Sequence, residues 1–171
     1  MSPHVFESRY QWNLYGSAGR NSFAGDFLRR WRGPDGFDLI LARIEIAGLW
    51  PDRSENRTDF TRLHPDYTVI LPQIIITRSA LEELGTQLAR WLTTRDAFLV
   101  DLCPQKDLPN QRLTVAIGPP RTPSTLGQGL FSAEYSGISF SHGKCDYVID
   151  QSCANIFLDE LRAALSSVED S

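Results

Sequence analysis

The chain has 171 residues, of which 42% are hydrophobic and 22% are charged, so it is long enough to bury the core of one domain. No stretch approaches the roughly 18 apolar residues of a membrane span, and the first residues lack the layout of a secretory signal peptide. Three cysteines at irregular spacing argue against a disulfide framework and fit a reducing compartment: Cys103, Cys145 and Cys153. We therefore predict a single cytoplasmic domain over residues 1–171 that has no membrane partner.

The formal net charge of −4 is unevenly distributed along the chain. Residues 145–171 carry six acidic residues against a single arginine, whereas residues 1–144 carry 15 acidic residues against 16 basic ones. A surface of one charge sign attracts partners of the opposite sign and speeds their association. We therefore expect the C-terminal segment to face a basic protein partner.

The first part of the chain is predicted to be mainly β-strand. Alternation of apolar and polar residues predicts a half-buried strand over residues 6–14, in which Trp12 and Leu14 face the same side. Residues 23–36, FAGDFLRRWRGPDG, are interpreted as a short helix or an irregular crossing that ends at the Gly-Pro-Asp-Gly turn. Residues 37–48 are apolar on both faces before they alternate, which predicts a strand in the centre of a sheet.

A long polar connection follows at residues 50–66, and strand character then returns at residues 67–77. Pro72 places this strand at a sheet edge or beside a bulge, because proline cannot donate to the ladder. An amphipathic helix comes next, with a capping box predicted at Ser79 and Glu82. Its apolar residues have helical spacing: Leu81, Leu84, Leu88, Trp91 and Leu92.

The remaining chain is predicted to hold four more strands and a final helix. The strands are expected at residues 97–103, 112–118, 130–140 and 144–150. The final helix begins near Asp150 or Ser152 and carries one apolar stripe, made of Cys153, Phe157, Leu161, Ala164 and Leu165. No internal repeat is visible, and regular βαβ alternation is missing. We therefore predict an α+β fold with one mainly antiparallel sheet of about six to seven strands and two main helices packed on one face.

Cys153 and His142 together raise the alternative of a thiol-dependent enzyme. A cysteine in the first turn of a helix feels the positive end of the macrodipole, which lowers the pKa of its thiol, and the histidine would act as its base. However, Cys153 also lies on the apolar stripe, where cysteine packs as a small hydrophobe. A carboxylate cap nearby would oppose the dipole, and no residue can be assigned to orient His142. We favour core packing and keep the enzyme as the alternative.

The sequence predicts no cofactor and no metal site. His142, Cys145 and Cys153 offer three zinc ligands, but the second closely spaced pair that is typical of structural zinc is missing. Phosphate-binding loops, the dinucleotide fingerprint, G-x-S-x-G and H-E-x-x-H are missing as well. Residues 27–32, FLRRWR, form a single basic cluster in a mildly acidic chain, so we do not expect nucleic-acid binding.

An aromatic-rich N-terminal strand and a charged loop precede a strand that leads into a helix of the form L-x2-L-x3-L-x2-W-L, from Leu81 to Leu92. Further strands and a terminal helix follow. This layout resembles that of small bacterial immunity proteins of the WapI type. The resemblance implies a non-enzymatic protein that binds a cognate toxin and blocks it, without a cofactor.

Acidic residues of the long loop and of the last helix are the candidate partner-binding residues. They are Asp52, Asp59, Asp66, Asp159 and Glu160. A further alternative is a scaffold or homodimer that pairs through the strand containing Pro72 or through a helix face.

Overall fold

The computed structural model describes residues 11–16, 22–33, 36, 38–48, 67–104, 111–119, 127–137 and 143–169. Four strands form a first antiparallel sheet in the order β1-β2-β3-β4. Their bounds are β1 Trp12–Tyr15, β2 Ser22–Arg32, β3 Asp38–Gly48 and β4 Tyr67–Thr77. Helix α1, Arg78–Thr94, follows β4 directly. The strand predicted over residues 37–48 therefore lies inside its sheet, between β2 and β4.

A second antiparallel sheet repeats this topology in the order β5-β6-β7-β8. Its strands are β5 Phe98–Asp101, β6 Gln111–Gly118, β7 Gly129–Gly137 and β8 Gly143–Ile149. Helix α2, Gln151–Glu169, follows β8. Each half of the described chain is thus a four-stranded meander that ends in a helix, although the sequence shows no repeat.

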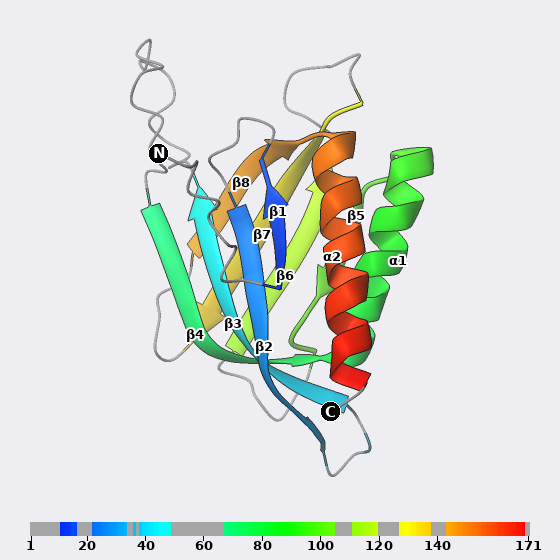
Figure 1. Cartoon of the computed structure of the whole chain (residues 1–171). Coiled ribbons are helices and arrows are strands. Elements are labelled where there is room, and N and C mark those ends of the chain that lie inside the picture. The colour runs from blue at the N-terminus through cyan, green and yellow to red at the C-terminus, as the bar shows by residue number, and fades with distance from the viewer. Residues whose placement is uncertain are drawn as a thin grey trace, which may run out of the picture.

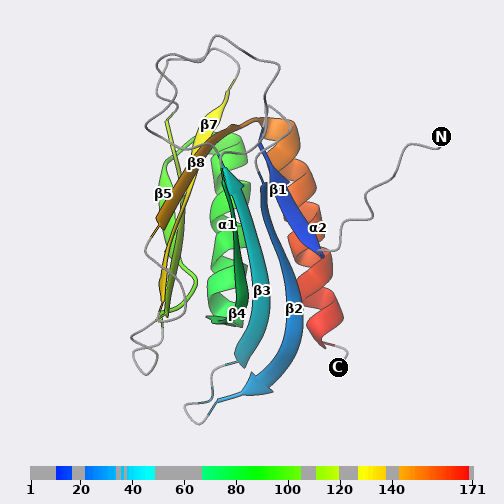
Figure 2. The same cartoon turned by 90° about the vertical axis from the view of Figure 1, so that its left-hand side faces the viewer.

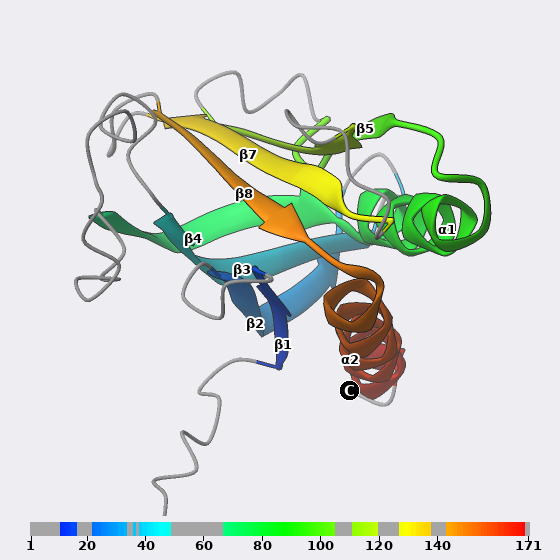
Figure 3. The same ribbon diagram turned by 90° about the horizontal axis from the view of Figure 1, so that it is seen from above.

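The two sheets lie in two layers, and both helices lie together at one side of them (Figures 1 and 3). Figure 1 shows α1 and α2 side by side and running in opposite directions. Helix α1 contacts β3 and β4 of the first sheet and β5 of the second, so it bridges the two layers (Figure 2). Helix α2 contacts β1 and β2. Helix α2 therefore packs against the first two strands of the described residues.

The inner faces of the two sheets share one hydrophobic core. The rings of Phe23 in β2 and Phe131 in β7 have centroids 5.4 Å apart, and the buried Tyr147 hydroxyl of β8 donates a hydrogen bond of 2.6 Å to the Leu14 carbonyl oxygen of β1. The Thr77 N–H of β4 donates to the Leu102 carbonyl oxygen at 3.3 Å. Both layers are thus joined by aromatic packing and by hydrogen bonds.

The predicted α+β class, the antiparallel pairing and the two helices are confirmed in the described residues. The single sheet of about six to seven strands is corrected to two sheets of four strands each in the same residues. Part of the difference is β2, Ser22–Arg32, which was expected to be a helix or an irregular crossing. In β2 a bulge between Phe27 and Arg29 interrupts the alternation of apolar and polar residues. Because the alternation is broken, the sequence pattern did not predict this strand. The division into two sheets was missed as well, because local patterns do not specify which strands pair.

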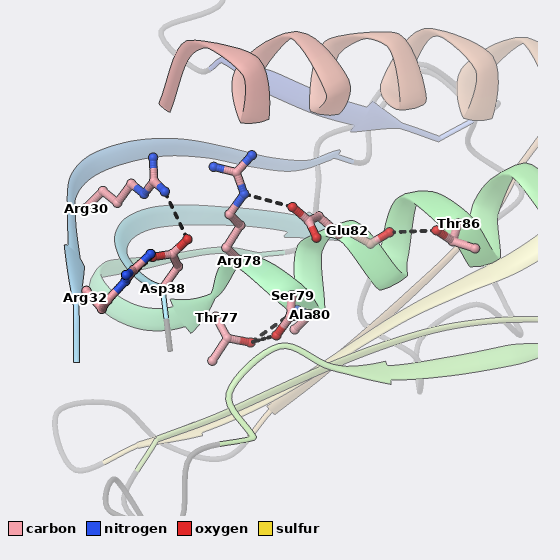
Figure 4. A network of polar contacts seen from close by, with 9 residues as sticks. All are labelled: Arg30, Arg32, Asp38, Thr77, Arg78, Ser79, Ala80, Glu82 and Thr86. Carbon is pink, nitrogen blue, oxygen red and sulfur yellow. Dashed lines mark hydrogen bonds and ion pairs between the residues drawn. The ribbon is translucent and has the colours of Figure 1, made fainter. Parts of the chain in front are cut away.

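Both helices and the remaining described strands lie in or close to the predicted ranges. Of the strand predicted over residues 6–14, residues 6–10 lie outside the described residues, and β1 covers Trp12–Tyr15. Two further details differ. Pro72 lies on the edge strand β4, beside a register shift opposite Ala42 and Ile44, as proline requires. The first helix is capped by Thr77 rather than by Ser79, since the Thr77 hydroxyl accepts a hydrogen bond from the Ala80 N–H at 3.2 Å (Figure 4). The expected capping partner Glu82 instead pairs with Arg78 at 2.8 Å.

Candidate functional site

Cys153 lies in the first turn of α2, half-buried against the hydrophobic core. Its N–H donates a hydrogen bond of 2.9 Å to Asp150 Oδ1, so Asp150 caps the helix. Burial, together with the Asp150 carboxylate, raises the pKa of the Cys153 thiol. The thiol is therefore protonated near neutral pH, which is unfavourable for a nucleophile.

The thiol alternative pairs Cys153 with His142, and the three zinc ligands considered from the sequence include Cys145 as well. His142 lies outside the described residues. Cys145 is fully buried in β8, and burial raises the pKa of Cys103 to about 12. Within the described ranges, no group of three or more His, Cys, Asp or Glu side chains is arranged to hold a metal ion.

The candidate partner-binding acids fall into two groups. Asp52, Asp59 and Asp66 lie outside the described residues. Asp159 is exposed on α2, whereas Glu160 is half-buried and faces β1. The Glu160 carboxylate accepts a hydrogen bond of 2.8 Å from the Asn13 N–H, and burial raises its pKa. Glu160 thus occupies the open edge of β1, so the two neighbouring acids of α2 have different surroundings.

The acidic residues of the C-terminal segment do not form one surface in the described part of the chain. Asp146 is half-buried on the outer face of the second sheet, where it pairs in register with Ser132. Asp150 caps α2, and the hydrogen bond from the Cys153 N–H lowers its pKa. Glu160 binds the edge of β1. Since Asp159 is exposed on α2, these four acids of the segment lie in four different environments.

An apolar hollow of about 540 Å³ lies on the outer face of the second sheet. Leu99, Ala116 and Ser132 are neighbours across β5, β6 and β7, and the pair Gly118 and Leu130 lies beside them. All of the lining residues except Ser132 are apolar or glycine, and they include Ala97, Leu99, Ala116, Gly118, Pro119 and Leu130. Such a surface favours contact with another apolar surface over contact with water.

Two residues define how open the hollow is. Leu99 is 65% exposed, more than any other large apolar residue in the described part of the chain. A Cβ atom added at Gly118 would meet no atom within 4 Å, so the glycine leaves free space at the surface. The hollow was not predicted from the sequence because the run of apolar residues at 97–103 is equally typical of a strand buried on both faces.

No protein family, curated protein sequence or solved structure matches this chain. Neither helix in the described ranges combines the length and the apolar character that crossing a membrane requires.

Proposed function

We propose that this protein is a non-enzymatic binding domain that holds an apolar segment of a partner protein in the hollow over β5, β6 and β7. The observation that carries the proposal is Leu99, which is 65% exposed beside a group of apolar neighbours. Scattered apolar residues are common on protein surfaces, but a contiguous hollow of them is typical of a binding site.

The flanking residues suit a partner that is partly polar. The row next to Leu99 contains Asp101, Thr114 and Glu134 on neighbouring strands. An apolar centre with a polar rim is the usual arrangement of a protein–protein interface, because the rim keeps water away from the centre. We infer that the partner inserts an apolar side chain beside Leu99 and places polar groups along this row.

As the specific form of this function, we propose a bacterial immunity protein in the cytoplasm that occludes a toxin. The layout resemblance through the helix from Leu81 to Leu92 supports this form, and the raised pKa of Cys153 supports binding over thiol chemistry. Occlusion needs only a stable complementary surface and no reacting group.

Two substitutions test the hollow without touching the core. Gly118→Leu places a side chain in the free space, and Leu99→Asp puts a charge at its centre. When either variant is co-expressed with a toxin encoded beside the gene, the cells should no longer be protected from the toxin. The binding free energy of the purified complex should weaken by about 2 kcal/mol, a typical contribution of a central interface residue. Ile156→Asp is the matched control, because Ile156 is 53% exposed on α2.

A photo-crosslinking residue at position 99 should capture the partner, whereas the same residue at position 156 should not. Full protection by both hollow variants, or capture only from position 156, would contradict the proposed site. If no protein encoded by a neighbouring gene binds this chain, the proposal of an immunity protein is wrong. The hollow can then be tested with any partner that is purified with the wild-type chain.

A further inference from the structure

The hairpin of β2 and β3 extends beyond the rest of the molecule. Both strands have 11 residues, whereas the corresponding strands β6 and β7 have 8 and 9. At about 3.3 Å per residue, the additional length is about 7 to 10 Å. Figure 2 shows the ends of β2 and β3 extending past the strands of the second sheet. The projecting end carries Arg29, Arg30, Trp31 and Arg32.

One carboxylate is shared between two of these arginines. Asp38 Oδ2 lies 2.9 Å from Arg30 Nη2 and Asp38 Oδ1 lies 3.6 Å from Arg32 Nε (Figure 4). The hydrogen bond from Arg30 lowers the pKa of Asp38. The Arg32 side chain is 74% exposed, so it is the member of this group that remains accessible.

A second accessible arginine lies beside an aromatic ring. The Arg29 guanidinium carbon lies 5.7 Å from the centroid of the Trp31 ring. The two residues lie on the same face of β2, because they are two positions apart in the strand. The bulge between Phe27 and Arg29 leaves Leu28 51% exposed. Bulges of this kind redirect side chains and are common next to functional sites.

We propose that this hairpin end, defined by Leu28, Arg29, Trp31 and Arg32, is a second interaction surface that binds an acidic segment of a protein. Arginine and tryptophan are the residue types most enriched at the centres of protein interfaces. A guanidinium group binds a carboxylate through two parallel hydrogen bonds. The surface is separate from the hollow and does not depend on it.

A nucleic acid is the less favoured occupant. The formal charge of the chain is −4, and phosphate binding usually needs several cations spread along a groove. Arg29 lies beside the Trp31 ring on one face of β2, and the exposed Arg32 lies on the other face. Two cations at the end of one hairpin match a short acidic peptide better than a strand of phosphates.

A short fluorescein-labelled oligoglutamate peptide tests the surface with the full-length protein by fluorescence anisotropy at low salt. The wild-type chain should bind the peptide, and binding should weaken as salt is added. The double variant Arg29→Ala with Arg32→Ala should weaken binding by about tenfold, as expected for the loss of two exposed charge pairs. The control, Arg90→Ala with Arg112→Ala, removes the same charge from exposed positions elsewhere and should change binding by less than about twofold.

Three results would overturn the proposal. They are no binding of the peptide by the wild-type chain, equal losses in the two double variants, and tighter binding of an oligothymidylate of the same charge that depends on Arg29 and Arg32. The last result would identify a nucleic-acid surface instead. Unchanged thermal unfolding midpoints for both variants would show that the fold is intact.

Discussion

The two halves of the molecule share a topology but differ in what they expose. In each half a four-stranded meander leads into a helix whose first turn is capped by the last residue before it, Thr77 for α1 and Asp150 for α2. The first half has longer strands and a projecting basic hairpin. The second half has shorter strands and an apolar hollow on its outer face. The common parts build the core, and the differing parts are the surfaces to which we assign binding.

The two helix starts also explain why a cysteine occupies position 153. The Thr77 hydroxyl accepts a hydrogen bond from the Ala80 N–H, and Asp150 accepts one from the Cys153 N–H. Ala80 is buried, and Cys153 packs against the same core. The cysteine thus stands at the position where the other helix has an alanine, which is a packing position.

The largest expected effect is that of removing the second half of the chain, because its helix α2 packs against β1 of the first half. Because α2 covers β1, a fragment that ends after residue 95 leaves the edge of β1 and the Trp12 side chain without their cover. We expect this fragment to be unfolded or aggregated when expressed alone. Circular dichroism and amide exchange check the result, and a cooperatively folded fragment would show that the halves are independent.

Two glycine substitutions, one in each half, should differ in their effect on the free energy of unfolding. A Cβ atom at Gly25 would collide with the Trp12 ring, whereas one at Gly118 meets open space. We expect Gly25→Ala to lower the free energy of unfolding by about 3 kcal/mol. Gly118→Ala should leave it within about 0.5 kcal/mol. Urea denaturation measures both, and equal effects would mean that Trp12 moves aside at little cost.

The two helix caps should differ in their dependence on pH. Thr77→Ala and Asp150→Ala should each cost about 1 kcal/mol at neutral pH. The pKa of Asp150 is lowered from its ordinary value of 3.8, so its contribution is present above that pH and is lost as the pH falls through the lower, folded-state value. Thr77 does not ionise, so its contribution should be constant. Urea titrations of both variants from neutral to acidic pH check the contrast.

The smallest effect is expected from Cys153→Ala, which makes the two helix starts alike. Because the thiol is half-buried and α1 has an alanine in the same place, we expect a loss below about 1 kcal/mol and unchanged partner binding. In the folded wild-type chain, iodoacetamide should modify Cys153 slowly near neutral pH. Rapid alkylation, or loss of a measured activity in the variant, would favour the thiol-dependent enzyme.

The sequence predicted the regular parts of the fold well. Helix α1 has an unbroken apolar spacing, and β3 has a run of apolar residues on both faces followed by alternation, so local periodicity was sufficient for both. Strand β2 was missed because Phe23 and Phe27 have helical spacing and the bulge at Leu28 breaks the alternation. The division into two sheets depends on pairing between distant strands, which no local pattern records.

The candidate surfaces were less predictable than the fold. Whether Leu99 is buried or exposed depends on what covers the outer face of its sheet, and that is set by elements far away in the sequence. The acidic segment suggested one charged face, but Asp150 and Glu160 are engaged with backbone N–H groups of α2 and β1. Their roles follow from positions in space that the order of charges does not reveal.

The packing of α2 against β1 also sets the order of events during translation. Helix α2 leaves the ribosome long after β1, so β1 and Trp12 remain uncovered until the chain through α2 has been synthesised. Nascent chains stalled before α2 should therefore remain sensitive to protease and bound to chaperones, and release should follow soon after the last helix emerges.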